Sequence, residues 1–379
     1  MIRHRLSPRV DWPEKVERLG FDFHTIDGET YWDESAAYEF TADEIDQLEA
    51  ATAELHRLCL TAMETLSGRV PDAYGLPPGF AQHLRRSWRR RDPELYGRFD
   101  LAWDGQGPPK LLEFNADTPT AILEASVVQW YWLQDVNPEA DQFNSIHEKL
   151  LETWAGLGPR DGGGPFHFTC VRDHAEDLGT TRYLMDTAIQ AGLEARFLFI
   201  DEIGWDQANR IFADLDGQPI TRMFKLYPWE WLRAEDFGPN LLLDTCRVLE
   251  PPWKLLLSAK AILPILWEMF PGHPNLLPAH FDPAPLEGKG RAYVQKPIYG
   301  REGADITTVA DGRVERTGEG VYGAEGFVFQ ARADLPEFDG NYPVIGSWVV
   351  GGRPAGLGIR EDRTPVTQNT SRFVPHYFL

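Results

Sequence analysis

The stretch RFDLAWDGQGPPKLLEFNADTPTAILEAS, Arg98 to Ser126, contains two runs of alternating apolar and polar residues on either side of a polar turn. Alternation with a period of two is typical of β-strands, and the glycines and prolines within residues 104–109 are typical of turns. The stretch therefore predicts a β-hairpin. If the hairpin is symmetric about its turn, Asp100 lies opposite Glu113 and Arg98 lies opposite Asn115.

The polar face of this hairpin raises a question of charge, because two carboxylates opposite each other on neighbouring strands repel. Either the face is solvated and the acids point into water, or a cation lies between them. Oxygens of Asp, Glu and Asn suit a hard cation such as Mg²⁺, which takes few protein ligands and keeps positions for substrate phosphates. Spacing alone leaves both interpretations open, and the second makes Asp100, Glu113 and Asn115 candidate metal ligands.

The end of the stretch predicts a helix over residues 121–134. Thr118 is a residue type that caps helix N-termini, and Pro119 is favoured at the first helical position. The N-terminus of such a helix would also be an anion site beside the acids.

Composition excludes several classes of function. The chain has 379 residues and a formal net charge of −21, which is length enough for two or three domains and too negative for nucleic acid or an anionic membrane as the main partner. No apolar run reaches the length of a membrane span. The three widely spaced cysteines, Cys59, Cys170 and Cys246, indicate buried thiols in a reducing cytosol, so a cytoplasmic location is expected.

The first two thirds of the chain contain two recognisable units. Residues 41–66 predict a long amphipathic helix that begins with a capping box of Thr41 and Glu44. The Gly-rich segment 158–166 is the expected domain boundary. After it, strand, helix and strand patterns over 166–171, 176–193 and 194–200 predict a β-α-β unit. Residues 211–227 predict a hairpin with Asp216-Gly217 at its tip.

The last third predicts an α+β arrangement with an antiparallel sheet. Residues 251–270 are mostly apolar and helix-like, and Pro264 is expected to kink or break them. Residues 292–309 and 342–362 each predict a strand pair, with Lys296 and Arg360 near strand ends. The loop KPIYGREG after Lys296 is either an ordinary hairpin turn or a lid whose backbone N–H groups cover phosphates. The expected domains are therefore residues 1–157, 158–250 and 251–379.

Five ordered blocks of the sequence resemble the glutathionylspermidine synthetase family in its synthetase-only branch. These blocks are RFDLAWDG (98–105), LLEFNADTPTAILEAS (111–126), KPIYGREGADI (296–306), YPVIGSWVVGGRPAGLGIRED (342–362) and TSRFVPH (370–376). The resemblance covers essentially the whole chain, without the amidase domain of bifunctional members. It implies an α/β (α+β) fold of the circularly permuted ATP-grasp type, with a pre-ATP-grasp α/β subdomain.

The resemblance also implies residues for ATP and Mg²⁺. Asp100, Glu113 and Asn115 match the family's Mg²⁺ ligands, the same three that the hairpin pattern selects. The remaining matches are Arg98 against the acyl phosphate, Arg360 near the transferred phosphoryl group, Lys260 and Lys296 on the ATP phosphates, and a lid from Gly300 through Arg301 to Gly303. For Lys260, a place on a helix surface is the alternative.

The implied substrate residues lie in two other segments. Thr118 and Thr120 stand where the family has serines that contact the thiol-peptide substrate. Glu176 and Asp177 match an acidic pair that receives the polyamine, and the alternative is a pair of ordinary acids at a helix start.

Together these residues imply an ATP-dependent acid–amine ligase that forms an amide through an acyl phosphate, using ATP and Mg²⁺. Its partners would be small molecules, a peptide-like acid and an amine, and neither nucleic acid nor a membrane. Two alternatives remain: a phosphotransferase or ATPase without an amine acceptor, and a non-catalytic nucleotide-binding regulator. The sequence leaves the identities of the acid and the amine open, and also the oligomeric state.

Overall fold

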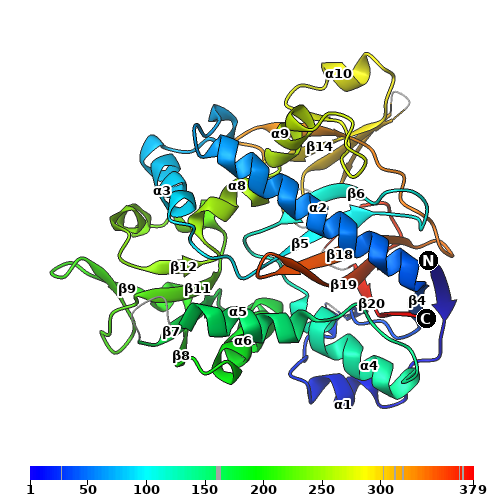
Figure 1. Cartoon of the computed structure of the whole chain (residues 1–379), viewed down its shortest axis with the longest axis horizontal. Helices are drawn as coiled ribbons and strands as arrows, with labels where there is room; N and C mark the ends of the chain where they lie inside the picture. Colours follow the sequence, from blue (N-terminus) through cyan, green and yellow to red (C-terminus); the bar gives the residue numbers. More distant parts are fainter. Residues whose placement is uncertain are drawn as a thin grey trace.

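The computed structural model describes residues 1–26, 28–158, 164–301, 303–310, 313–317, 320–366, 368 and 371–379. Its centre is an antiparallel five-stranded sheet whose strands come from two separate parts of the sequence, residues 96–115 and 342–374 (Figure 1). In spatial order the strands are β20 (Arg372–Val374), β19 (Arg353–Asp362), β18 (Tyr342–Val350), β5 (Tyr96–Ala102) and β6 (Lys110–Asn115). The hairpin predicted from the opening stretch is therefore one edge of this sheet.

The predicted hairpin register is confirmed. Arg98 pairs with Asn115 and Asp100 pairs with Glu113, with a register shift just after Asp100. On the other face of the hairpin, the rings of Phe99 and Phe114 stack with centroids 3.9 Å apart. This apolar face belongs to the main core, so the alternate polar residues point away from that core.

Helix α2 (Ala42–Leu66) covers the apolar face of the central sheet (Figure 1). The predicted capping box of Thr41 and Glu44 is present at its start. Thr52 Oγ1 lies 2.6 Å from Ser347 Oγ of β18, which fixes the helix against the strand. Helix α5 (Ile146–Leu157) also packs on β18, and Ser145, just before it, bonds the backbone of Ala355 in β19.

A second antiparallel sheet follows from the last third of the chain, as predicted. Its order is β13 (Ala279–His280), β17 (Phe327–Ala331), β14 (Tyr293–Pro297), β15 (Ile306–Ala310) and β16 (Arg313–Thr317). The apolar segment before it forms α8 (Leu255–Ser258) and α9 (Ile262–Met269). The break comes at residues 259–261, where Lys260 N–H donates to the Ile298 carbonyl, 2.8 Å away. Pro264 lies in the first turn of α9, where a missing N–H costs no helical bond.

The predicted β-α-β unit is confirmed within a parallel sheet of order β12 (Arg247–Leu249), β11 (Arg222–Leu226), β7 (Phe166–Cys170) and β8 (Ala195–Phe199). Helix α6 (Ala175–Gln190) connects β7 to β8. The predicted hairpin over 211–227 is confirmed only around its tip, where Ala213 bridges Pro219 and the Ile220 N–H donates to the Phe212 carbonyl at 2.8 Å. Beyond the tip the prediction is wrong, because β10 (Ile211–Ala213) pairs along its length with β9 (Gly204–Asp206), and β11 pairs in parallel with β7 and β12. The buried apolar strand β11 gains more from the sheet centre than from a surface hairpin.

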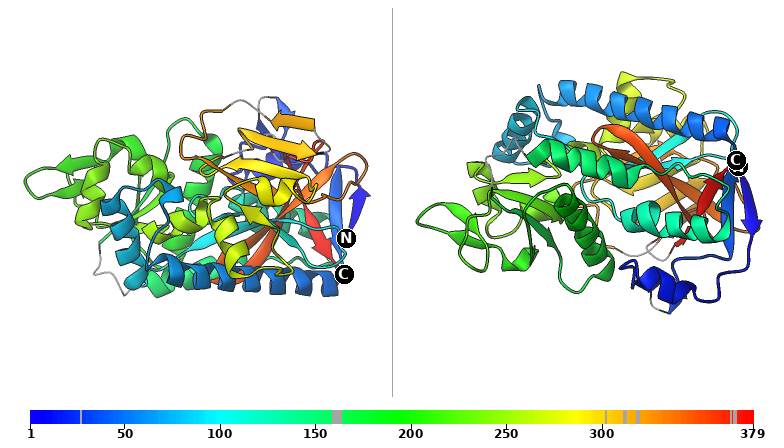
Figure 2. Two further views of the ribbon diagram at one scale, coloured as in Figure 1. Left: turned by 90° about the horizontal axis from the view of Figure 1, so that it is seen from above. Right: turned by 60° about the horizontal axis from the view of Figure 1, so that its bottom comes forward.

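The parallel sheet lies at one end of the molecule and the two antiparallel sheets at the other (Figure 2). Predicted segments 1–157 and 251–379 both contribute strands to the central sheet. The division into three domains stays a prediction, and residues 159–163 of the expected boundary lie outside the described residues.

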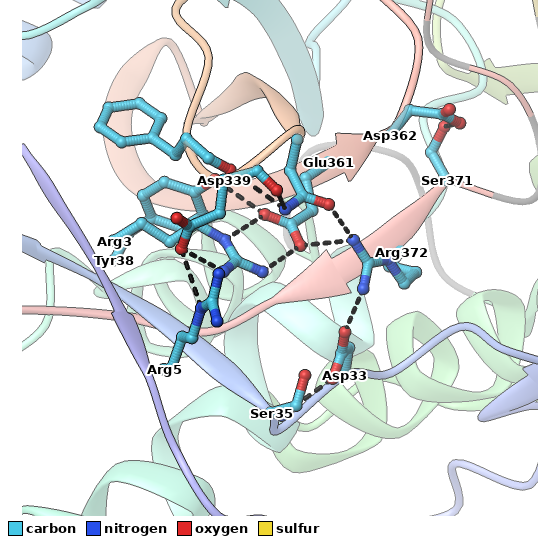
Figure 3. Close-up of polar contacts among 12 residues, drawn as sticks. Arg3, Arg5, Asp33, Ser35, Tyr38, Asp339, Glu361, Asp362, Ser371 and Arg372 are labelled. Carbon is cyan, nitrogen blue, oxygen red and sulfur yellow. Dashed lines mark hydrogen bonds and ion pairs between the residues drawn. The ribbon is translucent and has the colours of Figure 1, made fainter.

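A fourth sheet brings the two ends of the chain together beside β19 (Figure 1). Its strands are β1 (Ile2–Arg5), β4 (Ala36–Phe40) and β21 (His376–Phe378). Glu361 of β19 is fully buried here, and its carboxylate accepts hydrogen bonds from Arg3, Tyr38 and Arg372 (Figure 3). This network holds the end of β19, and with it the neighbouring Arg360.

The remaining elements are short or lie at the periphery. They are helices α1 (Trp12–Glu17), α3 (Pro78–Arg89), α4 (Gln129–Val136), α7 (Trp229–Leu232) and α10 (Ala284–Glu287), the π-helical segment Glu124–Val128, strands β2 (Thr25–Ile26) and β3 (Glu29–Thr30), and short 3₁₀ segments at Asp72–Tyr74, Ile200–Glu202, Gly238–Leu243 and Pro252–Lys254. The fold is mixed α/β, as predicted. Among the described residues, no helix has the length and apolar character needed to cross a membrane.

Candidate functional site

One cavity of about 840 Å³ collects every site residue that the sequence selected. Its lining includes Arg98, Asp100, Glu113, Asn115, Thr118, Thr120, Glu176, Asp177, Lys260, Lys296, Gly300, Arg301, Gly303 and Arg360. These residues lie on or beside the central sheet, the second antiparallel sheet and the β-α-β unit of the parallel sheet. Their convergence is a property of the fold, because they are spread over more than half of the sequence.

The two opposed carboxylates of the hairpin each have cationic partners. Arg98 Nε donates to Asp100 Oδ1 at 2.6 Å, and an Arg360 terminal nitrogen donates to Asp100 Oδ2 at 2.9 Å. Glu113 Oε2 lies 2.9 Å from Lys260 Nζ. The charges that the sequence pattern left uncompensated are thus balanced by basic side chains from β5, β19 and the α8–α9 break.

The amide of Asn115 joins the two carboxylates. Its Nδ2 lies 3.3 Å from Asp100 Oδ2 and 3.2 Å from Glu113 Oε1. A half-turn of the amide would bring Oδ1 to the same place, giving three hard oxygen donors around one point. This donor set fits Mg²⁺, which needs few protein ligands. Among the described residues, no group of three or more His, Cys, Asp or Glu side chains could hold a metal ion, so such a site would depend on the amide.

Two lysines approach the same carboxylates, Lys296 from β14 of the second sheet and Lys260 from the break between α8 and α9. Lys296 Nζ donates to the Leu112 carbonyl at 3.0 Å and to Gln330 Oε1 at 2.7 Å. Burial lowers the pKa of Lys296 to about 8, although the Glu113 charge opposes that shift. Burial would raise the pKa of Glu113, but the charges of Lys260 and Lys296 more than offset it and hold that pKa well below its usual range. Lys296 and Glu113 are therefore both ionised at neutral pH.

Lys260 lies inside the cavity wall and not on a helix surface. It is 8% exposed, in the break between α8 and α9, and its Nζ also donates to the Gly300 carbonyl at 2.7 Å. Lys260 thus connects Glu113 of the hairpin to the start of the predicted lid.

The predicted lid is attached to the substrate side of the cavity through Arg301. One terminal nitrogen of Arg301 donates to Thr118 Oγ1 at 2.8 Å, and the other donates to Glu230 Oε1 at 2.6 Å. Its guanidinium also lies 5.6 Å from the ring centre of Trp231. Glu302 lies outside the described residues. The planar guanidinium holds its two terminal nitrogens in a fixed fork, which sets the spacing between Thr118 and Glu230.

The segment after β6 is extended, and the predicted cap at Thr118 is wrong. The helix begins at Ile122, after Ala121 adopts a left-handed φ of 68°. Two contacts across the fold hold the segment: Tyr96 Oη donates to the Pro119 carbonyl at 3.0 Å, and Arg98 donates to the Thr120 carbonyl at 2.8 Å. These contacts compete with helical geometry and leave both threonines facing the cavity.

The acidic pair Glu176 and Asp177 occupies the first turn of α6 and also lines the cavity, so the two interpretations of the pair are compatible. The helix is capped by His174, whose Nδ1 accepts from the Asp177 N–H at 3.3 Å. Burial raises the pKa of Glu176, and a hydrogen bond from Thr120 works in the opposite direction. Thr120 therefore contacts Arg98 through its carbonyl and Glu176 through its side chain.

Sequence reasoning missed several polar residues at the site, notably Tyr31, Glu124, Glu230 and Gln330. Tyr31 Oη donates to Glu124 Oε1 at 2.7 Å, and Gln330 accepts from Lys296. A signal existed for Glu124, which is a single acid inside the apolar stretch 121–128. For Tyr31, Glu230 and Gln330 no local pattern marks a role, since each reaches the site through tertiary packing.

The chain matches known proteins over its whole length. Residues 3–379 match the family model described as "Glutathionylspermidine synthase preATP-grasp". A Haemophilus influenzae protein named "Putative acid--amine ligase" is 43% identical over 98% of both chains. Trypanothione synthetase of Crithidia fasciculata is 29% identical over 79% of this chain, and the bifunctional glutathionylspermidine synthetase/amidase of Escherichia coli is 29% identical over 89% of it.

The chain spans 50% of the length of the trypanothione synthetase and 58% of the bifunctional enzyme. A solved glutathione synthetase-like effector from Globodera pallida superposes with a TM-score of 0.58 at 11% identity, covering 98% of this chain and 97% of its own, which supports the ATP-grasp type of fold. With the family model matched from residue 3 to residue 379, the chain belongs to the glutathionylspermidine synthase family, a family of ligases that form carbon–nitrogen bonds.

Proposed function

We propose that this chain activates a peptide-like carboxylic acid with ATP and joins the resulting acyl phosphate to a cationic amine. The observation that carries the proposal is the position of Thr120. Its backbone carbonyl is held by Arg98, on the basic side of the cavity, and its side chain bonds Glu176, on the acidic side. An acyl group placed at Thr120 would lie between a site for phosphate and a site for an ammonium group.

The basic side suits phosphoryl transfer from ATP to the acid. Lys260, Lys296, Arg98 and Arg360 all line the cavity within reach of the hairpin carboxylates. Phosphoryl transfer depends mainly on positioning and on neutralising charge, and these cations can do both. Mg²⁺ held by Asp100, Glu113 and Asn115 would add charge neutralisation at the ATP phosphates.

The acidic side suits the amine. A primary or secondary amine is cationic at neutral pH, and Glu176 and Asp177 supply the negative charge that would bind and orient it. The Arg301 contact with Thr118 and Glu230 closes the cavity above the reacting groups, which would keep water from the acyl phosphate. Attack by the amine then forms the amide and releases phosphate.

The test is a screen of purified protein with Mg-ATP against pairs of peptides and polyamines. ADP release is measured together with mass spectrometry for a new amide, and Arg360→Ala serves as the inactive reference. We expect ADP release that requires an acid, and an amide that requires both substrates. ADP release that never yields an amide with any amine would contradict the proposal and favour an ATPase or phosphotransferase.

A further inference from the structure

Glu124 is a fully buried carboxyl directly behind the acidic side of the cavity. It begins the π-helical segment Glu124–Val128, three residues after Ala121 with its left-handed φ of 68°. Glu124 Oε1 accepts from Tyr31 Oη, and Oε2 is buried without a hydrogen-bond partner among the described residues. A π-helical turn, an unfavourable φ and a half-satisfied carboxyl in one place are features that cluster at functional sites.

Tyr31 connects this carboxyl to the cavity. Its side chain lines the cavity while its hydroxyl bonds Glu124, which itself does not line it. The titratable and charged groups around Glu124 are the neutral phenol of Tyr31, Glu176 of α6 and Arg98 of β5. Arg360 of β19 acts on Tyr31 and on Glu176, and His147 of α5 is engaged with Tyr183. Glu124, Tyr31 and Glu176 thus form a cluster of two carboxyls and one phenol that opens into the acidic side of the cavity. Glu124 is its innermost member.

We infer that Glu124, acting through the Tyr31 hydroxyl, accepts the proton that the bound ammonium group must lose before it attacks the acyl phosphate. The inference rests on the proposed function and adds a step to it. Glu176 and Asp177 bind the amine as a cation, and a cation has no free electron pair. A second acceptor nearby resolves this conflict between binding and chemistry.

The proton balance of the step is complete. The ammonium gives one proton to the Tyr31 oxygen as Tyr31 passes its own proton to Glu124. The neutral nitrogen then forms the carbon–nitrogen bond, and the carbon–oxygen bond to phosphate breaks. The second proton leaves the new amide nitrogen with the departing phosphate, which becomes hydrogen phosphate. No oxidant or reductant is needed.

The basicity of Glu124 matches this task. Burial and the Glu176 charge raise the pKa of Glu124 to about 8. An ordinary glutamate, with a pKa of about 4.3, would accept a proton from an alkylammonium of pKa about 10.4 with an equilibrium disadvantage of about 10⁶. For a carboxyl of pKa about 8 the disadvantage falls to about 10², and the ionised form of Glu124, whose fraction grows as the pH rises towards 8, is the form that accepts the proton. Burial raises the pKa of Tyr31 as well, so its hydroxyl stays protonated and acts as a relay.

A first experiment needs no substrate. Infrared titration of the wild-type protein should show a protonated carboxyl at neutral pH that ionises with a midpoint of about 8, and this signal should be missing in Glu124→Gln. Glu250 is another buried carboxyl with a raised pKa, of about 7, so the test depends on the difference between the two proteins. If no protonated-carboxyl signal of wild type is lost in Glu124→Gln, the inference is overturned.

A second experiment compares two nucleophiles with Mg-ATP and glutathione as the acid probe. Spermidine must lose a proton before it attacks, whereas hydroxylamine is already uncharged at neutral pH. We expect Glu124→Gln and Tyr31→Phe to reduce amide formation with spermidine by about 10² or more, the scale of one general base, and to keep hydroxamate formation within about threefold. In wild type, the rate with spermidine should rise with pH around a midpoint of about 8. In Glu124→Gln this midpoint should move to higher pH, towards the pKa of the amine itself.

The matched control is Tyr183→Phe, which removes another buried phenol hydroxyl, bonded to Ser126 in the same π-helical segment but outside the cavity lining. It should behave as wild type with both nucleophiles. Equal losses with spermidine and hydroxylamine in Glu124→Gln would show a merely structural role and overturn the inference. If wild type forms no hydroxamate with any acid, the proposed function fails, and the infrared titration still decides the state of Glu124.

Discussion

Glu113 Oε2 lies 2.9 Å from Lys260 Nζ, and this contact joins the central hairpin to the break between α8 and α9. The sequence pattern alone suggested that Glu113 and Asp100 repel, so that loss of one charge would relieve strain. In the structure each carboxylate is paired, and removal of Glu113 or Asp100 takes the carboxylate away from a buried cation, Lys260 or Arg98 respectively. Neutralising Glu113 or Asp100 is therefore expected to destabilise the fold, whereas repulsion between the two alone would have made the same change stabilising.

We expect Glu113→Gln to abolish ATP turnover and to lower the free energy of unfolding by about 1–3 kcal/mol, the usual cost of an unsatisfied buried partner. Chemical denaturation and ADP release measure the two effects. Glu315→Gln is the control, because Glu315 lines the same cavity and has no assigned role. Undiminished Mg-dependent turnover in Glu113→Gln would remove this residue from the metal and nucleotide site.

Substitutions of Lys296 and Arg360 should have different effects, the first on ATP binding and the second on the rate of phosphoryl transfer. Lys296 is held in place by Leu112 and Gln330, and it should contact ATP before reaction, so Lys296→Ala should weaken ATP binding. Arg360 should act mainly on the transferring phosphoryl group. Arg360→Ala should bind ATP nearly as wild type and lose about 10²–10³ in kcat, the scale of one lost transition-state donor.

Calorimetric titration with ATP and steady-state kinetics distinguish the two variants. Arg332→Ala, an exposed arginine on the rim of the cavity, serves as the charge control. The opposite pattern, with lost ATP affinity in Arg360→Ala and lost turnover alone in Lys296→Ala, would reject both assignments.

ATP affinity should fall as pH rises above about 8, because burial lowers the pKa of Lys296 to about 8 and ATP binding needs its charged form. The decline should reach up to about tenfold per pH unit. The linkage to stability has the opposite sign: between about 8 and the unfolded value of 10.5, the unfolded chain binds more protons, so the contribution of Lys296 to the free energy of unfolding rises with pH. Lys296→Arg keeps its charge, and a pH-independent affinity in wild type would contradict the prediction.

Neutralising Glu176 and Asp177 should affect only the reaction with the amine. In Glu176→Gln with Asp177→Asn, loss of two charge-assisted contacts of about 1.5–3 kcal/mol each should lower kcat/KM for the amine by about two to four orders of magnitude. ADP release that depends only on the acid should persist, since acyl phosphate formation does not use these residues. The matched control is Asp201→Asn with Glu202→Gln, an acidic pair that bonds Arg172 outside the cavity lining. Unchanged amide formation in the first variant would place the amine elsewhere.

Local patterns in the sequence predicted features whose causes are local. The pairing of Asp100 with Glu113 follows from alternation around a turn, and the capping box of Thr41 and Glu44 follows from side-chain spacing. Where a distant contact decides the outcome, the same reasoning failed. Thr118 does not cap a helix because Tyr96 and Arg98 hold the next residues extended, and β11 leaves its predicted hairpin to enter the parallel sheet.

For the site, too, the sequence predicted which residues come together but not the distant contacts between them. Residue types and family resemblance selected the residues that line the cavity, including Lys260 and Arg360. They could not show that Arg301 bridges Thr118 and Glu230, or that Tyr31 reaches Glu124 from a segment 93 residues earlier. Such partners depend on how separate segments pack, and no spacing within one segment encodes them.

Because β18 lies between β5 and β19, the central sheet cannot be completed until late in synthesis on the ribosome. About 240 residues of chain separate β5 from β18, and synthesis at about 5–20 residues per second takes about 12–48 s to cover them. Throughout that time the hairpin of β5 and β6 exists with one edge unpaired, and an open apolar edge invites association with other chains. Chains released before residue 342 should therefore aggregate, because the edge of β5 that β18 covers stays open in them.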